Sequence, residues 1–134
     1  MSNLQDHINS AKRTGTIEFS IEERSPDCVI SRMPVTLGIL NPYGTVQAGA
    51  MIWLADVTAS ILALEGRTIE DDGKGFPLAI DIHTNLMGNQ RDGEITAEAR
   101  FLSAGKTVLV IRTRVIGNKG KLLAEVTTSH VIAK

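Results

Sequence analysis

Residues Val46–Leu64, which read VQAGAMIWLADVTASILAL, decide the fold of this chain. The stretch is rich in helix-forming residues and holds one charge, Asp56. The turn residues Asn41–Gly44 precede it and Gly66 follows it, as at the two ends of a helix. Because this helix is apolar on nearly every side, we expect other elements to wrap around it.

Strand-like runs stand on both sides of the predicted helix. Before it, Thr16–Glu22 alternates apolar and polar residues as a half-buried strand does, and Cys28–Val35 is a second extended run. After a polar loop come four more runs, joined in part by short hairpin turns: Phe76–Met87, Gly93–Ala104, Lys106–Ile116 and Lys121–Ile132. The pattern predicts an α+β fold in which two strands and a long antiparallel meander form a curved sheet around one central helix.

Composition narrows the classes of protein and of function. The chain has 134 residues, the size of one domain, and we read residues 1–134 as a single domain with an N-terminal helical segment at 1–14. Its net charge of −1 argues against electrostatic binding of nucleic acid. The sequence has no uninterrupted run of about 20 apolar residues, the length that a membrane span needs, and its first residues lack an apolar leader. We therefore expect a cytoplasmic protein.

Metal and disulfide chemistry are not expected. The single cysteine, Cys28, lies in an apolar run and is predicted to be a buried small hydrophobe. One cysteine excludes an internal disulfide, and no pair of histidines has the spacing of zinc ligands.

Asp56 is the first candidate for chemistry. An ionised carboxylate within an apolar helix costs several kcal/mol unless it is paired or its pKa rises. Three explanations remain open from the residues alone: a structural hydrogen bond, a wet boundary between subunits, or a functional carboxylate.

The start of the helix is the second candidate. The first backbone N–H groups of a helix have no internal acceptor and carry the positive end of its dipole. The small side chains of Ala48 and Gly49 would let a substrate oxygen approach these amides, which makes an oxyanion-type site. Close packing of helix against sheet would explain the small residues equally well.

Asn41-Pro-Tyr-Gly-Thr-Val-Gln-Ala-Gly, followed by Leu54-Ala55-Asp56, resembles the signature N-x-x-G-x-x-H-G-G…L-A-D of hotdog-fold acyl-CoA thioesterases of the phenylacetate-degradation type. The similarity runs from about residue 15 to the C-terminus and includes Ala79-Ile80-Asp81 and Gly105-Lys106-Thr107. The resemblance implies a hotdog fold and the hydrolysis of an acyl-CoA to a free acid and coenzyme A.

It also implies roles for particular residues. Asp56 would be the catalytic nucleophile or the general base for a water, the N–H of Ala48 would polarise the thioester carbonyl, and Asn41 would orient the carbonyl or the water. In this family the site lies between subunits, with the carboxylate supplied by the partner. We therefore expect a homo-oligomer, either a dimer or a dimer of dimers.

Further residues are expected to meet the substrate. Ala79, Asp81 and His83 lie on the next strand, where alternation places all three on one face. His83 would be a general base or a simple hydrogen-bonding group. Arg100 and Lys106 would contact coenzyme A phosphates or be solvated charges. No cofactor is expected other than the coenzyme A that forms part of the substrate.

The chain departs from the signature at three positions. Gln47 replaces the histidine, Ala48 replaces the first glycine, and Ala79 stands where a serine or threonine is common. Gln47 and Ala79 keep a second hypothesis open, a non-catalytic acyl-CoA binding or regulatory protein. A hotdog hydratase would need a histidine that the motif lacks.

Three apolar side chains would line an acyl pocket or pack in the core: Trp53, Met51 and Leu64.

Overall fold

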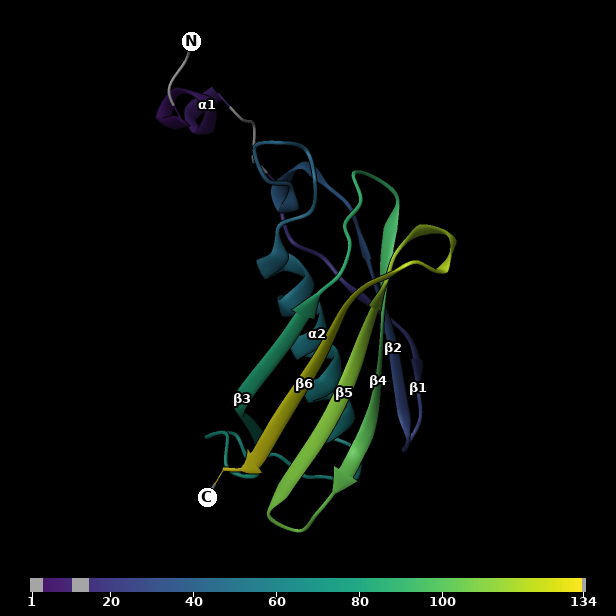
Figure 1. The fold of residues 1–134 in the computed structure, drawn as a ribbon. Coiled ribbons are helices and arrows are strands. Elements are labelled where there is room, and N and C mark those ends of the chain that lie inside the picture. The colour runs from purple at the N-terminus through teal and green to yellow at the C-terminus, as the bar shows by residue number, and fades with distance from the viewer. Residues whose placement is uncertain (1–3, 11–14, 134) are drawn as a thin grey trace.

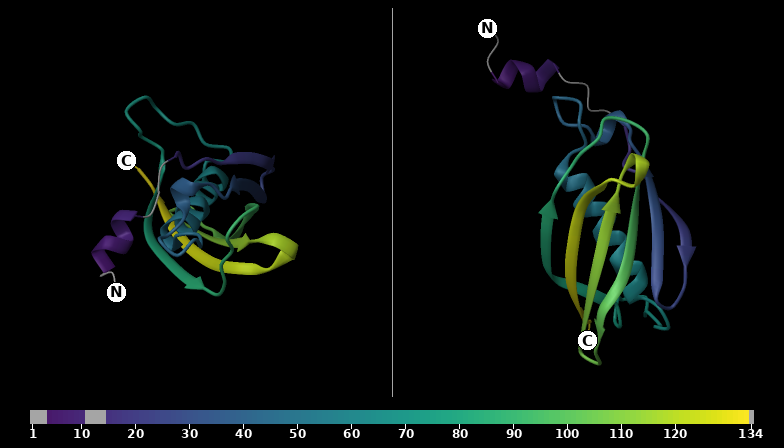
Figure 2. Two further views of the ribbon diagram at one scale, coloured as in Figure 1. Left: turned by 90° about the horizontal axis from the view of Figure 1, so that it is seen from above. Right: turned by 45° about the vertical axis from the view of Figure 1, so that its right-hand side comes forward.

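The structure is a computed structural model that describes residues 4–10 and 15–133. Its main elements are one long helix and six strands (Figure 1). The long helix is α2 (Ala48–Ala63). All described elements, in chain order, are α1 (Leu4–Ser10), β1 (Ser20–Arg24), β2 (Cys28–Pro34), the 3₁₀ turn η1 (Leu37–Ile39), α2, β3 (Pro77–Leu86), β4 (Glu94–Ala104), β5 (Val108–Ile116), the 3₁₀ turn η2 (Asn118–Gly120) and β6 (Leu122–Ile132). The predicted α+β class is confirmed, as a curved hotdog sheet around α2 (Figure 2).

The six strands form one antiparallel sheet in the order β1-β2-β4-β5-β6-β3. The hairpins β4–β5 and β5–β6 agree with the predicted meander. The prediction that all four strands follow one another as a meander was wrong for β3. This strand pairs with β6 at the far edge of the sheet, because β2 occupies the free side of β4. Two strands, β1 and β3, are therefore edges of the sheet.

Helix α2 has two distinct faces. The face toward the sheet is buried, with side chains at helical spacing: Ala50, Met51, Leu54, Ala55, Thr58, Ala59, Leu62 and Ala63. The opposite face is half-buried although it remains apolar, and it includes Ile52, Trp53, Val57 and Ile61. The sheet wraps the helix as predicted, but it leaves the opposite face without a covering layer, because a single sheet covers only one side of a cylinder about 10 Å across.

The N-terminal part also differs from the prediction. Strand β1 begins at Ser20 instead of Thr16, and all its residues are exposed, so it is not the half-buried strand we expected. As an edge strand it packs on β2 alone. A helical segment was predicted over residues 1–14. The structure has α1 within that range, and residues 1–3 and 11–14 lie outside the described part.

Strand β3 contains a bulge that changes which side chains share a face. Ala79 pairs with His130 and Asp81 pairs with Ser129, so Ile80 is an extra residue without a partner. Opposed residues in a ladder point to the same side, and His130 is buried under the helix. Ala79 therefore faces the helix side while Asp81 faces outward, which corrects the prediction that they share one face.

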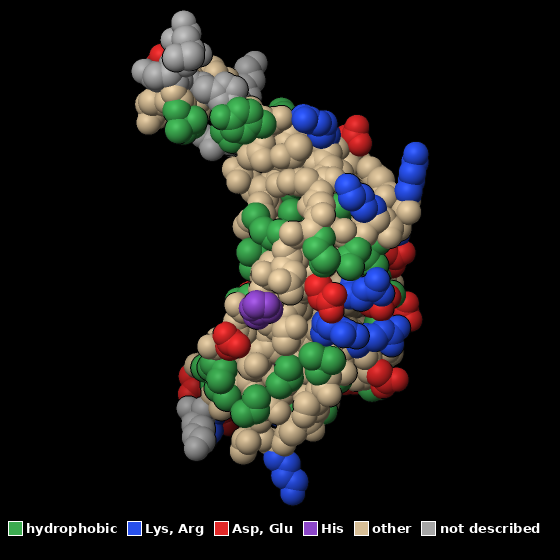
Figure 3. All heavy atoms as spheres, viewed as in Figure 1, with side chains coloured by type: hydrophobic (Ala, Val, Ile, Leu, Met, Phe, Trp, Pro, Cys, Tyr) green, Lys and Arg blue, Asp and Glu red, His purple; other side chains and the backbone are tan. Residues whose placement is uncertain are grey.

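The outer face of the sheet is charged and solvated. Arginines alternate with glutamates on it, for example in the ion pairs Arg112–Glu125 at 3.3 Å and Arg100–Glu98 at 3.0 Å. Figure 3 looks at this face and shows the acidic and basic side chains side by side. Such exposed pairs each contribute about 0–1 kcal/mol. Cys28 is buried, as predicted.

Candidate active site

Asn41 organises the turn before the helix. Its Oδ1 accepts hydrogen bonds from the backbone N–H of Tyr43 at 2.9 Å and of Thr45 at 3.1 Å. Its Nδ2 donates to Thr45 Oγ1 at 2.6 Å, which leaves one amide hydrogen for another acceptor. Gly44 in this turn has φ +83°, a conformation that suits glycine. The side chain is thus largely used to shape the loop.

Asn89 fixes the residue that precedes the helix. Its Oδ1 accepts a hydrogen bond from Val46 N–H at 3.0 Å, and its Nδ2 donates to the carbonyl oxygen of Val46 at 2.9 Å. The side chain thus pairs with the main chain of Val46 as a neighbouring strand would. Asn89 belongs to no motif of the sequence, and only its place in a turn-rich stretch distinguishes it there.

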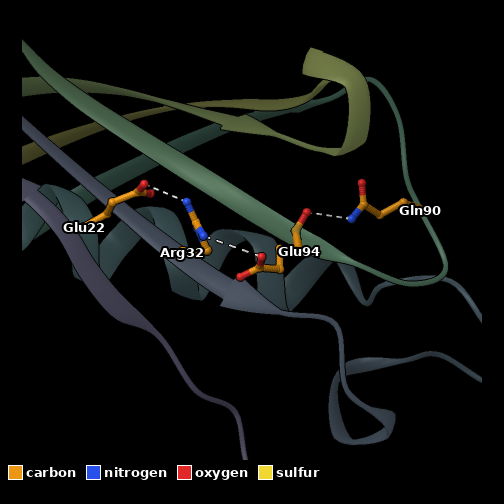
Figure 4. A network of polar contacts seen from close by, with 4 residues as sticks. All are labelled: Glu22, Arg32, Gln90 and Glu94. Carbon is orange, nitrogen blue, oxygen red and sulfur yellow. Dashed lines mark hydrogen bonds and ion pairs between the residues drawn. The ribbon is translucent and has the colours of Figure 1, made fainter.

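The loop that carries Asn89 is itself held by Gln90. Its Nε2 donates to the carbonyl oxygen of Glu94 at 2.9 Å, and its Oε1 accepts from Asn118 N–H at 2.8 Å. Figure 4 shows the hydrogen bond between Gln90 and Glu94 beside the ion pairs of Arg32 with Glu22 and Glu94. The loops before β4 and before β6 therefore form a fixed support for the start of α2.

The first turn of α2 presents unbonded amides. The N-cap residue Gln47 makes no side-chain capping bond, and its carbonyl accepts from Ala50 N–H at 3.0 Å. Among the described residues, nothing accepts a hydrogen bond from the N–H of Ala48 or Gly49. Gly49 is exposed, and a Cβ placed there would have no neighbour within 4 Å. Two helix N–H groups are thus open to an incoming oxygen.

Asp56 lies on the half-buried face of α2, not on the face that packs on the sheet. Within the described part of the chain no hydrogen bond holds its carboxylate. Asp56 is eight residues after Ala48, which corresponds to about 12 Å along a helix. One substrate carbonyl cannot reach the amide and the carboxylate of the same chain, since a catalytic contact spans about 3 Å.

His130 was not predicted as a site residue, and it is fully buried on β6. Its Nε2 lies 2.8 Å from Thr128 Oγ1, and its Nδ1 lies 3.4 Å from the carbonyl oxygen of Pro77. Burial lowers the pKa of His130, while the hydrogen bond to Pro77 and the negative charge of Asp56 act to raise it. The alternation Val126, Thr128, His130 could have revealed a polar residue on the inner face.

The other predicted site residues lie away from the helix start. Asp81, His83 and Arg100 are on the outer face, where Arg100 Nε donates to Glu98 at 3.0 Å. Ala79 is on the edge strand opposite His130. Lys106 is in the β4–β5 hairpin, at the other end of the sheet from the start of α2 (Figure 1). One chain therefore brings together only Asn41, Gln47, Ala48 and Gly49.

In residues 4–10 and 15–133 no group of three or more His, Cys, Asp or Glu side chains is arranged to hold a metal ion. In the same ranges no helix has the length and apolar character needed to cross a bilayer. The cytoplasmic location remains a prediction.

The chain is similar to known proteins in fold and in sequence. No family model matches the chain. A mutant thioesterase from Staphylococcus aureus superposes with a TM-score of 0.79 at 26% identity, over 87% of this chain and 93% of that one. A mutant thioesterase from Pseudomonas aeruginosa gives a TM-score of 0.77 at 23% identity, over 86% and 81%. The 1,4-dihydroxy-2-naphthoyl-CoA hydrolase of Listeria monocytogenes is 29% identical, over 81% of this chain and 85% of its own length.

These likenesses agree with the motif around Asn41 and Asp56 and with the six-stranded sheet around α2. The chain has the hotdog fold, is similar to thioesterases of that fold in sequence and structure, and is accordingly a thioester hydrolase.

Proposed function

We propose that this protein hydrolyses an acyl-CoA thioester to a carboxylic acid and coenzyme A. The observation that carries the proposal is the pair of unbonded amides at the start of α2, on the half-buried Ala48 and the exposed Gly49. Relatives from two organisms named as 1,4-dihydroxy-2-naphthoyl-CoA hydrolases support coenzyme A as the carrier of the acyl group.

The chemistry follows from charge. The N–H groups of Ala48 and Gly49 donate to the thioester oxygen, whose negative charge grows as the carbonyl carbon is attacked. Each such donor contributes about 3–4 kcal/mol to the barrier reduction. Asp56 either attacks the carbonyl carbon itself or takes a proton from an attacking water. The C–S bond then breaks, the thiolate leaves, and water supplies the oxygen of the acid. Asn41, through its remaining amide hydrogen, and Gln47 would orient the reacting groups.

The site is proposed to form between two copies of the chain. The distance of about 12 Å between Ala48 and Asp56 rules out a shared contact within one chain. Strand β3 is an edge of the sheet, and four of its apolar side chains are exposed: Leu78, Ile80, Ile82 and Leu86. Pairing of β3 with β3 of a second copy would run the two α2 helices antiparallel. A two-fold axis level with Ile52, midway between Ala48 and Asp56, would bring the carboxylate of one subunit to the amides of the other.

The same arrangement gives Lys106 a role. An antiparallel pair places the β4–β5 hairpin of one subunit near the level of the helix start of the other. Lys106 of the partner subunit would then reach the phosphates of coenzyme A. A nucleotide that extends over the outer face would meet Asp81, His83 and Arg100, whose charge is shared with Glu98. Ala79, on the edge strand β3 through which the subunits would pair, would be the nearest of these predicted residues to the carbonyl carbon of the acyl group. Pairing of such dimers would give the dimer of dimers, which the sequence analysis left open as the alternative to a simple dimer.

A thiol-release assay with mixed subunits tests the proposal. Asp56→Asn removes the carboxylate, and Ala48→Pro removes one amide hydrogen while proline remains acceptable at the first position of a helix. Each variant alone should be inactive. Refolding an equal mixture should restore about one quarter of wild-type activity, because half of the dimers are mixed and each mixed dimer has one complete site.

The control is Asp71→Asn, an exposed loop residue, which should leave turnover unchanged. An active Asp56→Asn variant would remove the carboxylate from the mechanism. Two inactive variants that stay inactive when mixed would remove the shared site.

A further inference from the structure

We propose that the acyl group occupies the pocket between the start of α2 and the segment Gly15–Phe19, and that Trp53 selects which acyl groups fit. We call Gly15–Phe19 the strap. This inference rests on the proposed hydrolysis of acyl-CoA, and it names the part of the molecule that recognises the substrate.

The pocket adjoins the unbonded amides. Its volume is about 390 Å³, and Gln47, Gly49 and Ala50 of the helix start form one side of it. Ile17, Ile39 and Trp53 supply the apolar walls. Small-molecule sites combine apolar walls with a few polar groups, and range over about 300–1,000 Å³. This pocket is at the small end of that range.

The strap is held in place by backbone contact. A Cβ at Gly38 would lie 2.9 Å from the carbonyl oxygen of Gly15, so the close approach of strap and η1 requires glycine there. Thr36 Oγ1 also donates to the carbonyl oxygen of Thr16 at 3.4 Å. The wall that carries Ile17 is therefore fixed against the turn before the helix.

Trp53 is held from the strap as well. The ring of Phe19 meets the indole edge-on, with centroids 5.5 Å apart and planes at 78°. Trp53 follows Gly49 by one helical turn, so its side chain stands beside the open amide. A thioester whose oxygen accepts a hydrogen bond from Gly49 would direct its acyl group toward the indole. The three residues named from the sequence are now distinguished, because Met51 is in the core and Leu64 is at the other end of the helix.

These walls favour a compact acyl group. A flat aromatic ring can pack on the indole and remain within the pocket, whereas a long alkyl chain must leave it and expose methylene groups to water. We therefore infer that aromatic or other short acyl-CoAs are preferred over long-chain ones.

Fluorescence provides a test that does not depend on turnover. Trp53 is the single tryptophan in the sequence, so its emission reports on this pocket alone. Phenacyl-CoA, a thioether that cannot be hydrolysed, should shift this emission saturably. Coenzyme A without an acyl group should not. Calorimetric binding of phenacyl-CoA with no change in emission would overturn the proposal.

Kinetics test the selection of substrate. The ratio of kcat/KM for benzoyl-CoA to that for decanoyl-CoA should fall at least tenfold in Trp53→Ala and about threefold in Ile17→Ala, because both changes open a wall. Trp53→Phe should keep most of the wild-type ratio. The control is Ile21→Ala, a similarly exposed apolar residue on β1 outside the pocket.

The possible outcomes separate the two proposals. An unchanged ratio in folded Trp53→Ala and Ile17→Ala would overturn the role of the pocket while the hydrolase stands. A wild-type protein that hydrolyses no acyl-CoA, yet responds to phenacyl-CoA in its emission, would overturn the proposed hydrolysis and leave the pocket standing.

Discussion

Asn89→Ala is the substitution whose effect follows most directly from the structure. It removes both hydrogen bonds to the main chain of Val46, at 3.0 and 2.9 Å, and leaves the Val46 carbonyl oxygen without that donor. Each bond contributes about 1 kcal/mol net and an unsatisfied part-buried carbonyl adds about 1 kcal/mol, while Val46 N–H keeps a longer hydrogen bond to the carbonyl oxygen of Gln90 at 3.2 Å. The free energy of unfolding should therefore fall by about 2–3 kcal/mol. For a domain of this size that corresponds to a drop in Tm of about 10 °C.

The same change should reduce turnover, because Val46 is two residues before the first open amide of the helix. Displaced amides stabilise the transition state less well, so kcat should fall at least tenfold while KM changes little. Thermal unfolding followed by circular dichroism measures the first effect, and thiol release measures the second at a temperature where the variant is folded.

Two companion variants sharpen this experiment. Asn89→Asp keeps the acceptor toward Val46 N–H but loses the donor toward its carbonyl, so it should recover part of the stability at most. Asp71→Ala, an exposed loop residue outside the sheet, is the control and should change Tm by less than about 2 °C. A loss below about 0.5 kcal/mol in Asn89→Ala, with kcat unchanged, would refute the assigned support of the helix start.

Three further predictions concern the carboxylate, the dimer edge and pH. Asp56→Asn should abolish thiol release while Tm stays the same or rises, because this carboxylate has no hydrogen-bond partner among the described residues; a large loss of Tm would return Asp56 to a structural role. Ile80→Arg, at a side chain 61% exposed on the edge strand, should give monomers in sedimentation and no activity, and active dimers would refute pairing through β3. Burial lowers the pKa of His130 below its ordinary 6.5, so the unfolded chain binds the proton more readily than the folded one. Tm should therefore decline as the pH falls below 6.5. This decline should be shallower in His130→Gln and unchanged in the exposed control variant His83→Gln.

The local patterns predicted most of the secondary structure. The helix over residues 46–64 agrees with α2 within two residues at each end, because capping turns and helix formers act over a few residues of chain. The strand of residues 28–35 and the last three strands also agree with the structure. Hydrophobic alternation is a local property, so these elements could be read from neighbouring residues.

The errors occurred where distant segments meet. Alternation alone could not reveal the bulge at Ile80, since the extra residue exists only relative to the partner strand β6. It also could not show that β3 pairs with β6, or that Asn89 would bond to Val46, which is 43 residues away. His130 was overlooked for the same reason, because its nearness to Asp56 depends on the packing of α2 on the sheet.

The sequence by itself determined the central helix, the strands around it and the motif from Asn41 to Asp56, because each depends on the residues next to it. Only the tertiary structure decided that the sheet leaves one face of α2 half-buried, that its first amides are unbonded, and that Asp56 is too far from them within one chain. These are relations in space between parts separated along the chain. They arise from the curvature of the sheet and the rigid rise of the helix, which no local pattern encodes.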